Sequence, residues 1–247
     1  MVEHPGMFRF LCLLLALTLS GWSEPLDLEA CARARVLYLG EEHDSASDHA
    51  RQLKILEYLS RGRSPVVVAE MFQNPSRAVV ADYVAGSLDD EDLKTQSEWE
   101  KRWGHAWDLY LPIWRLCQQR HIPIYPLRNS TESGKNLSKL GAQAFTMQEK
   151  QGLAPEPYEF GPHPETLRPV FEAHAGPVSD EAFARFLKVQ TLWEEYMAAQ
   201  IRRALRENDG QIIVLVGQGH LTHGHTLPRR VQREWPHPLT QKVVLTD

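Results

Sequence analysis

The sequence predicts an α/β fold with a mostly parallel central sheet flanked by helices. Short apolar runs typical of buried strands alternate with segments of helical periodicity along the 247 residues. An apolar run at 36–39, a helical segment at 45–60 and a second apolar run at 66–70 follow one another closely, and Ser45 is a suitable cap for the helix. This is the pattern of a βαβ unit, whose two strands are parallel.

The rest of the chain continues the alternation of helix and strand. Residues 75–120 predict a long helical stretch, and 122–125 predict a strand whose proline favours a strand start or a sheet edge. Residues 180–208 predict one long helix, followed by strands at 212–216 and 243–245. The length is that of one domain, or of one domain with an insertion.

Two segments differ from this pattern. Residues 130–177 are rich in Pro, Gly and Glu and predict an irregular insertion, which could form a lid. Residues 1–23 carry Arg9 before the apolar run 11–19, which is shorter than the ~20 residues that span a bilayer. This pattern is typical of a secretory signal peptide, so we expect a mature domain of 24–247, exported to the periplasm or cell envelope. An uncleaved anchor is the alternative.

Cysteine usage bears on anchoring and on redox state. A lipid anchor is not expected, because Trp22 stands where a lipobox would place cysteine after residues 19–21. Outside the signal, Cys31 and Cys117 remain. In an exported protein they could form a disulfide, but independent burial as small apolar side chains is an equal alternative. The net charge of −5 lacks the basic footprint of a nucleic-acid-binding protein, so no nucleic acid is expected as a partner.

A glycine followed three residues later by a histidine occurs directly after two predicted strands. Gly40 precedes His43, and Gly217 precedes His220, while Glu70 ends a third apolar run. Ligands bind at the carboxyl ends of parallel strands, so these three side chains should meet if the strands are neighbours. Two imidazoles and a carboxylate could ligate zinc, manganese or iron. The alternative is a hydrogen-bonded network that only holds the loops.

Four aromatic residues form the other concentrated signal. Trp103, Trp107, Tyr110 and Trp114 have the spacing of one helical stripe, although Gly104 interrupts the helical pattern. Core packing or a subunit interface is the favoured interpretation. The alternative is a flat wall for a planar ligand such as haem, with the Tyr110 phenol as a ligand of ferric iron.

Other functional motifs are weak or missing. His223 and His225 add two imidazoles after the second motif, and we expect solvated loop residues there rather than metal ligands. The sequence has no Gly-x-Ser-x-Gly elbow, no His-Glu-x-x-His helix and no phosphate-binding glycine-rich loop. Hydrolytic nucleophiles and nucleotide binding are therefore not supported.

Several motifs, taken in order, resemble one known family. They are residues 39–44 with His49 and Gln52, residues 68–71, residues 107–110, residues 122–124 with Asn129, residues 190–198 and residues 216–220. Over most of the mature chain the sequence resembles the ChaN-like haem-binding uptake family, within the wider Tiki/TraB superfamily.

The resemblance implies an EreA/ChaN-like fold with a helical insertion, in an exported protein of bacterial haem or iron uptake. It implies haem binding, rather than enzymatic activity, in a crevice at the carboxyl ends of the strands. It also implies an outer-membrane haem receptor system as a partner and a homodimer around stacked haems. Tyr110 is implied as the iron ligand, and Trp107, His43 and His220 as further haem contacts. Glu194 stands where the family pattern leads us to expect Asp.

The superfamily also contains metal-dependent proteases built on paired Gly-x-x-His motifs and a glutamate. This resemblance implies a rival function as a metal-dependent hydrolase that binds zinc or manganese through His43, Glu70 and His220. A metal-bound water would then be the nucleophile, with Glu41 as the general base.

Overall fold

The computed structural model describes residues 27–158, 160–161, 164–222 and 227–245. The predicted signal peptide, the Trp22 position and the histidines at 223 and 225 lie outside the described residues.

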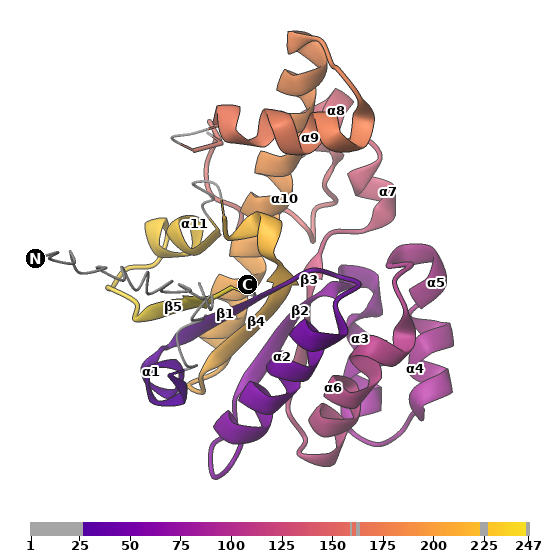
Figure 1. The fold of residues 1–247 in the computed structure, drawn as a ribbon, viewed down its shortest axis with the longest axis vertical. Coiled ribbons are helices and arrows are strands. Elements are labelled where there is room, and N and C mark those ends of the chain that lie inside the picture. The colour runs from indigo at the N-terminus through magenta and orange to yellow at the C-terminus, as the bar shows by residue number, and fades with distance from the viewer. Residues whose placement is uncertain (1–26, 159, 162–163, 223–226, 246–247) are drawn as a thin grey trace, which may run out of the picture.

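The core of the protein is one sheet of five parallel strands, in the order β3-β2-β4-β1-β5 (Figure 1). The strands are β1 (Val36–Glu41), β2 (Val66–Gln73), β3 (Ile124–Arg128), β4 (Ile212–Gly217) and β5 (Gln241–Val244). The α/β prediction is confirmed. The last strand in the chain begins two residues earlier than predicted. β3 is an edge strand, which is where a strand can accommodate a proline such as Pro126.

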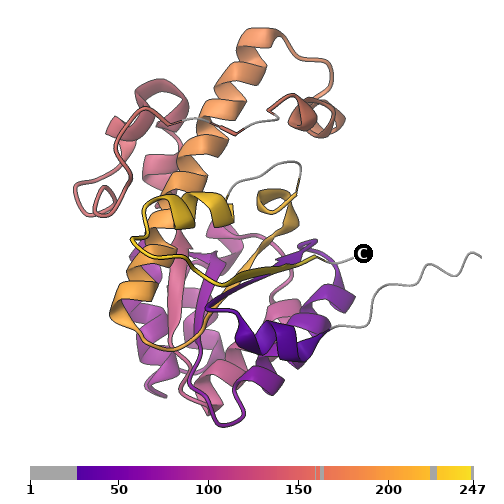
Figure 2. The same cartoon turned by 90° about the vertical axis from the view of Figure 1, so that its left-hand side faces the viewer.

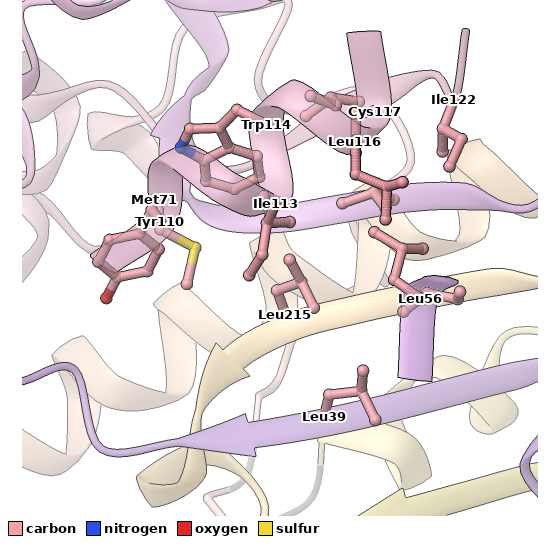
Figure 3. Close-up of a cluster of buried hydrophobic side chains, with 14 of the residues drawn as sticks. Leu39, Leu56, Met71, Tyr110, Ile113, Trp114, Leu116, Cys117, Ile122 and Leu215 are labelled. Carbon is pink, nitrogen blue, oxygen red and sulfur yellow. The ribbon is translucent and has the colours of Figure 1, made fainter. Parts of the chain in front are cut away.

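Helices cover both faces of the sheet because successive strand residues point in opposite directions. Leu37 and Leu39 pack with helices α2 (Ala46–Leu59), α3 (Arg77–Val84) and α6 (Trp107–Gln119), whereas Val36 and Tyr38 pack with α10 (Asp180–Glu207) and α11 (Leu227–Arg233). Figure 3 shows part of the first of these two clusters. β1, β2 and β4 are buried on both faces along their whole length.

The predicted helical stretch at 75–120 is wrong as a single element. It consists of η1 (Asn74–Ser76), α3, α4 (Asp90–Gln96), α5 (Trp99–Arg102) and α6. Gly86 (φ +80°), Glu98 (φ 53°) and Gly104 (φ +84°) adopt the left-handed conformation between these helices. Because Gly104 ends α5, Trp103 lies outside α6, and the predicted single stripe of four aromatic residues is interrupted.

The insertion lies beyond the carboxyl ends of the strands. It contains α7 (Thr131–Gly134), α8 (Leu137–Leu140), η2 (Gly141–Ala144), η3 (Pro164–Leu167) and α9 (Arg168–Ala175). Figure 2 shows α10 rising past the sheet, with residues 131–158 on one side of it and α9 on the other. Helix α10 therefore belongs to both parts, and the small core of Leu137, Phe145, Leu192 and Tyr196 ties the insertion to it.

The remaining elements are α1 (Leu28–Arg33) and η4 (Gln218–His220). Cys31 and Cys117 are both buried free thiols, which agrees with the second of the two alternatives drawn from the sequence. Among the described residues, no helix is both long enough and apolar enough to cross a membrane.

The turn before β4 gives a direct test of this packing. An ideal Cβ on Gly210 would lie 2.3 Å from the Ser64 carbonyl oxygen, so Gly210→Ala should lower the free energy of unfolding by about 1–3 kcal/mol. Gly219→Ala is the matched control, because nothing lies within 4 Å of its ideal Cβ. Urea denaturation measures both variants, and equal losses would contradict this account.

Candidate functional site

The order of the strands brings together the three side chains that the sequence singled out. β4 lies between β1 and β2, so the segments that carry His43, Glu70 and His220 adjoin one another. His220 Nε2 lies 3.7 Å from Glu70 Oε1, and the backbone N–H of Gly217 donates to Glu70 Oε2 at 2.7 Å. We call these three residues and their carboxylate partners, Glu41 and Glu194, the strand-end site.

Gly217 is needed because His43 and Glu70 approach across it. An ideal Cβ at this position would lie 2.7 Å from His43 Cε1 and 3.5 Å from Glu70 Oε2. Because Gly217 has no side chain, the imidazole of His43 can lie against the end of β4. Sequence alone could not show this, because Gly217 and His43 lie in segments far apart in the chain.

Glu41 is a buried carboxylate that is fully supplied with donors. His43 Nδ1 lies 3.0 Å from its Oε1, Tyr110 donates to the same oxygen at 2.7 Å, and Gln52 Nε2 donates to Oε2 at 2.8 Å. His49 Nε2 lies 3.0 Å from the His43 carbonyl oxygen and holds the same loop. A carboxylate can only accept here, so His43 carries its proton on Nδ1 and Glu41 orients that ring. In this arrangement Glu41 orients His43, and its role as a general base stays a prediction.

The His43 ring is half-exposed, with 30% of its side chain accessible. Its Nε2 makes no hydrogen bond to a described residue, and Trp103 and His105 pack against the ring with centroids 4.7 and 4.8 Å away. Burial would lower the pKa of His43, but the hydrogen bond to Glu41 and the charge of Glu70 outweigh this and raise it. His105 is held in a similar way, with Nδ1 2.9 Å from Asp44 Oδ1.

Tyr110 points inward. Its side chain is completely buried, and its hydroxyl lies at the end of the apolar cluster closest to the carboxyl ends of the strands (Figure 3). Burial and the neighbouring Glu41 both raise the pKa of Tyr110. Iron binds tyrosine as the phenolate, so ligation would require this hydroxyl to leave Glu41 and reach the surface. Tyr110 as the iron ligand stays a prediction. Trp107 is also buried, edge-to-face against Trp99.

His220 is held between two carboxylates. Its Nδ1 lies 3.3 Å from Glu194 Oε1, opposite the contact of Nε2 with Glu70. Burial would lower the pKa of His220, but these two carboxylates raise it to about 10. Burial would raise the pKa of Glu70, but His220 and His43 lower it to about 2. At neutral pH His220 is therefore an imidazolium in a buried ion network.

Helices α10 and α11 supply partners to this network that were not predicted from the sequence. Arg230 Nε donates to Glu194 Oε2 at 3.1 Å, and Arg230 also pairs with Glu195. Two adjacent glutamates within an otherwise apolar part of a long helix were the available signal, because buried carboxylates need partners. The identity of those partners depends on where α11 packs.

The strand-end site was predicted to bind metal. Among the described residues, no group of three or more His, Cys, Asp or Glu side chains is arranged to hold a metal ion. The metal-ligand role of His43, Glu70 and His220 stays a prediction.

Two cavities lie near the carboxyl end of the sheet. A small one of about 270 Å³, the strand-end pocket, is bordered by Gln73 of β2, Arg128 of β3, Lys135 and Trp193. A larger one of about 840 Å³ lies between residues 140–160 and α10. None of His43, Glu70 and His220 lines the larger cavity, so this cavity and the strand-end site are in different places.

The ion network predicts a pH dependence of stability. A histidine titrates near 6.5 when unfolded and near 10 in this site, so its contribution is complete below about pH 6.5 and declines toward pH 10. Glu70 contributes fully above about pH 4.5 and loses its contribution as pH falls toward 2.

Between pH 7 and 9 the free energy of unfolding of the wild type should fall by at most about 1.4 kcal/mol per pH unit because of His220. His220→Gln should not show this fall. Urea denaturation across this range measures the slopes. His237→Gln is the matched control, since His237 is exposed. A wild-type slope that persists unchanged in His220→Gln would contradict the assignment.

Comparison with known structures supports the fold. The structure with cofacial heme binding to ChaN of Campylobacter jejuni is similar, with a TM-score of 0.67 and 14% sequence identity over 88% of this chain and 83% of that one. A succinoglycan biosynthesis protein has a TM-score of 0.51 and 13% identity over 90% of this chain and 69% of that one. At such identities the likeness concerns the fold. A search of curated proteins finds no match.

The family comparison is more specific. The model of the family described as haem-binding uptake, Tiki superfamily, ChaN matches residues 28–231. These residues include both Gly-x-x-His motifs, Glu70 and the whole of α10. The chain therefore belongs to the ChaN family of haem-binding uptake proteins in the Tiki superfamily.

Proposed function

We propose that this protein is an exported haem-binding protein of bacterial haem or iron uptake, and that haem lies over the carboxyl edge of the sheet beside His43. The observation that carries the proposal is the state of the His43 ring. Glu41 holds Nδ1, while Nε2 makes no hydrogen bond to a described residue on a half-exposed side chain. Carboxylate–histidine pairs of this kind orient imidazole for ligation of a metal.

The residues around His43 fit a planar iron-containing ligand. Trp103 is a half-buried aromatic ring next to His43, and His105 is a second imidazole whose Nδ1 is held by a carboxylate. When bound, haem would supply an iron with open axial positions, and histidine is a common axial ligand. His43 would bind and orient that iron, Glu41 would hold the ring, and Trp103 would exclude water from one side.

His220 and Tyr110 fit the axial position less well. Both ring nitrogens of His220 face carboxylates, and the Tyr110 hydroxyl is buried on Glu41. Their contacts make them supports for the site, and His220 is also a candidate contact for a haem carboxylate. The proposed homodimer and the outer-membrane receptor system rest on the family, and export rests on the apolar run at 11–19.

Hemin titration of the mature protein tests the proposal. We expect a saturable Soret shift, which His43→Ala weakens at least about tenfold in affinity, as expected for loss of a metal ligand. Tyr110→Phe should lower the affinity much less than His43→Ala does, since it removes one of the donors to Glu41 and no proposed iron ligand. Absence of a saturable shift would overturn haem binding itself.

The larger cavity provides the matched control. Tyr158→Phe changes a phenol that borders this cavity and lies away from His43. If Tyr158→Phe abolishes the Soret shift while His43→Ala leaves it intact, haem binds in the larger cavity and the location proposed above is wrong.

The metal-dependent hydrolase is the second candidate function. It is favoured by one observation, the meeting of His43, Glu70 and His220 at the carboxyl ends of three neighbouring strands. The function would place zinc or manganese among these side chains, with a metal-bound water as the nucleophile.

Metal analysis of the purified protein separates the two functions. The hydrolase predicts about one zinc or manganese ion per chain, lost in both His43→Ala and His220→Ala, together with peptide cleavage that a chelator abolishes. Metal-free protein that binds hemin and cleaves no peptide would exclude the hydrolase.

A further inference from the structure

Two cations border the strand-end pocket without forming an ion pair to a described residue. Among the described residues, neither Arg128 nor Lys135 forms an ion pair. Arg128 is half-buried, and NH1 donates only to the Arg102 carbonyl oxygen, at 3.3 Å. Neighbouring Arg102 differs, since its Nε donates to Glu98 at 2.7 Å. Glu70 lies within electrostatic range of Arg128 but forms no ion pair with it, so an anion in direct contact with this half-buried guanidinium would still stabilise it.

The pocket is small, and most of the residues that border it have polar side chains. Thr131 and Asn129 border it with Gln73, and the Trp193 ring of α10 forms another wall. Its volume of about 270 Å³ suits a carboxylate on a short arm and is below the range for a whole drug-sized ligand. The planar guanidinium of Arg128 can donate two parallel hydrogen bonds to such a carboxylate.

The pocket adjoins the proposed axial ligand. The Arg128 guanidinium lies over the Trp103 ring, 5.5 Å from its centroid, and the Trp103 ring packs on His43 at 4.7 Å. One indole ring therefore separates an available imidazole from an available cation. Haem has iron at its centre and carboxylates on its rim. Its iron could therefore meet the His43 imidazole while a carboxylate meets the Arg128 guanidinium.

We infer that Arg128 and Lys135 form an anion subsite that binds a ligand carboxylate, and that in the proposed haem complex this carboxylate is a propionate. The second clause rests on the proposed function, whereas the subsite itself depends only on the unpaired cations and the pocket. Arg128 would make the directional contact, and exposed Lys135 would contribute charge at the entrance.

The first experiment compares hemin with hemin dimethyl ester, which has the same iron and ring but no carboxylates. Wild-type protein should bind the diacid about tenfold more tightly, the effect of one charge-assisted hydrogen bond. The double variant Arg128→Gln, Lys135→Gln should lose this preference while binding the ester as wild type does. Equal affinity of wild-type protein for diacid and ester would exclude the propionate as the ligand of the subsite, even though haem binding itself stands.

Matched controls remove the same charges elsewhere. Arg203→Gln removes an arginine that already pairs with Glu207 at 2.7 Å, and Lys139→Gln removes an exposed lysine near Lys135. The double control should keep the preference for the diacid. If the double control loses the preference as much as the Arg128→Gln, Lys135→Gln variant does, the net charge of the protein explains the preference, and the inference fails.

A second experiment needs no porphyrin. Succinate is titrated while the indole N–H resonances of Trp103 and Trp193 are followed by NMR. We expect saturable shifts that the Arg128→Gln, Lys135→Gln variant lacks, with inorganic phosphate as a comparison for plain anion binding. Succinate binding without a diacid preference would assign the subsite to a free carboxylate and exclude the propionate. If succinate causes no saturable shift and the protein shows no preference for the diacid, there is no anion subsite. If succinate binds but hemin does not, only the proposed function fails.

Discussion

The buried carboxylate of Glu41 is the constraint on which the site depends. It stands at the end of β1 with 1% of its surface exposed, and an ionised carboxylate at such a position must be supplied with donors. Its donors come from α2, α6 and the loop after β1, through Gln52, Tyr110 and His43. The hydrogen bonds to Glu41 therefore hold α2 and α6 against the sheet. They also orient His43, which is half-exposed whereas Gln52 and Tyr110 are buried.

Strand order provides the second constraint. Because β4 lies between β1 and β2, the end of β4 passes between His43 and Glu70, and a side chain larger than glycine at 217 would block their approach. Glu194 of α10, which is itself paired with Arg230, then holds His220 from the far side. The same edge of the sheet carries an oriented imidazole, a buried ion network and two unpaired cations, which is a suitable surface for an anionic, metal-containing ligand.

Much of the fold could be predicted because its signals are local. Apolar runs and helical periodicity identified the five strands, α2 and α10, with ends within a few residues of those observed. The stretch 75–120 failed because three residues with positive φ divide it, and one of them, Glu98, is not a residue that normally marks such a break. The gathering of His43, Glu70 and His220 followed from the rule that parallel strands end at one edge.

By itself, the sequence determined the class of fold, the family and the edge of the sheet where the functional side chains lie, because these depend on periodicity and on motifs within single segments. The tertiary structure decided what each side chain does there. Tyr110 faces the core and His43 faces outward, Glu194 and Arg230 join the network, and Arg128 forms no ion pair with a described residue. Exposure and pairing depend on contacts between segments far apart in the chain, which no local pattern records.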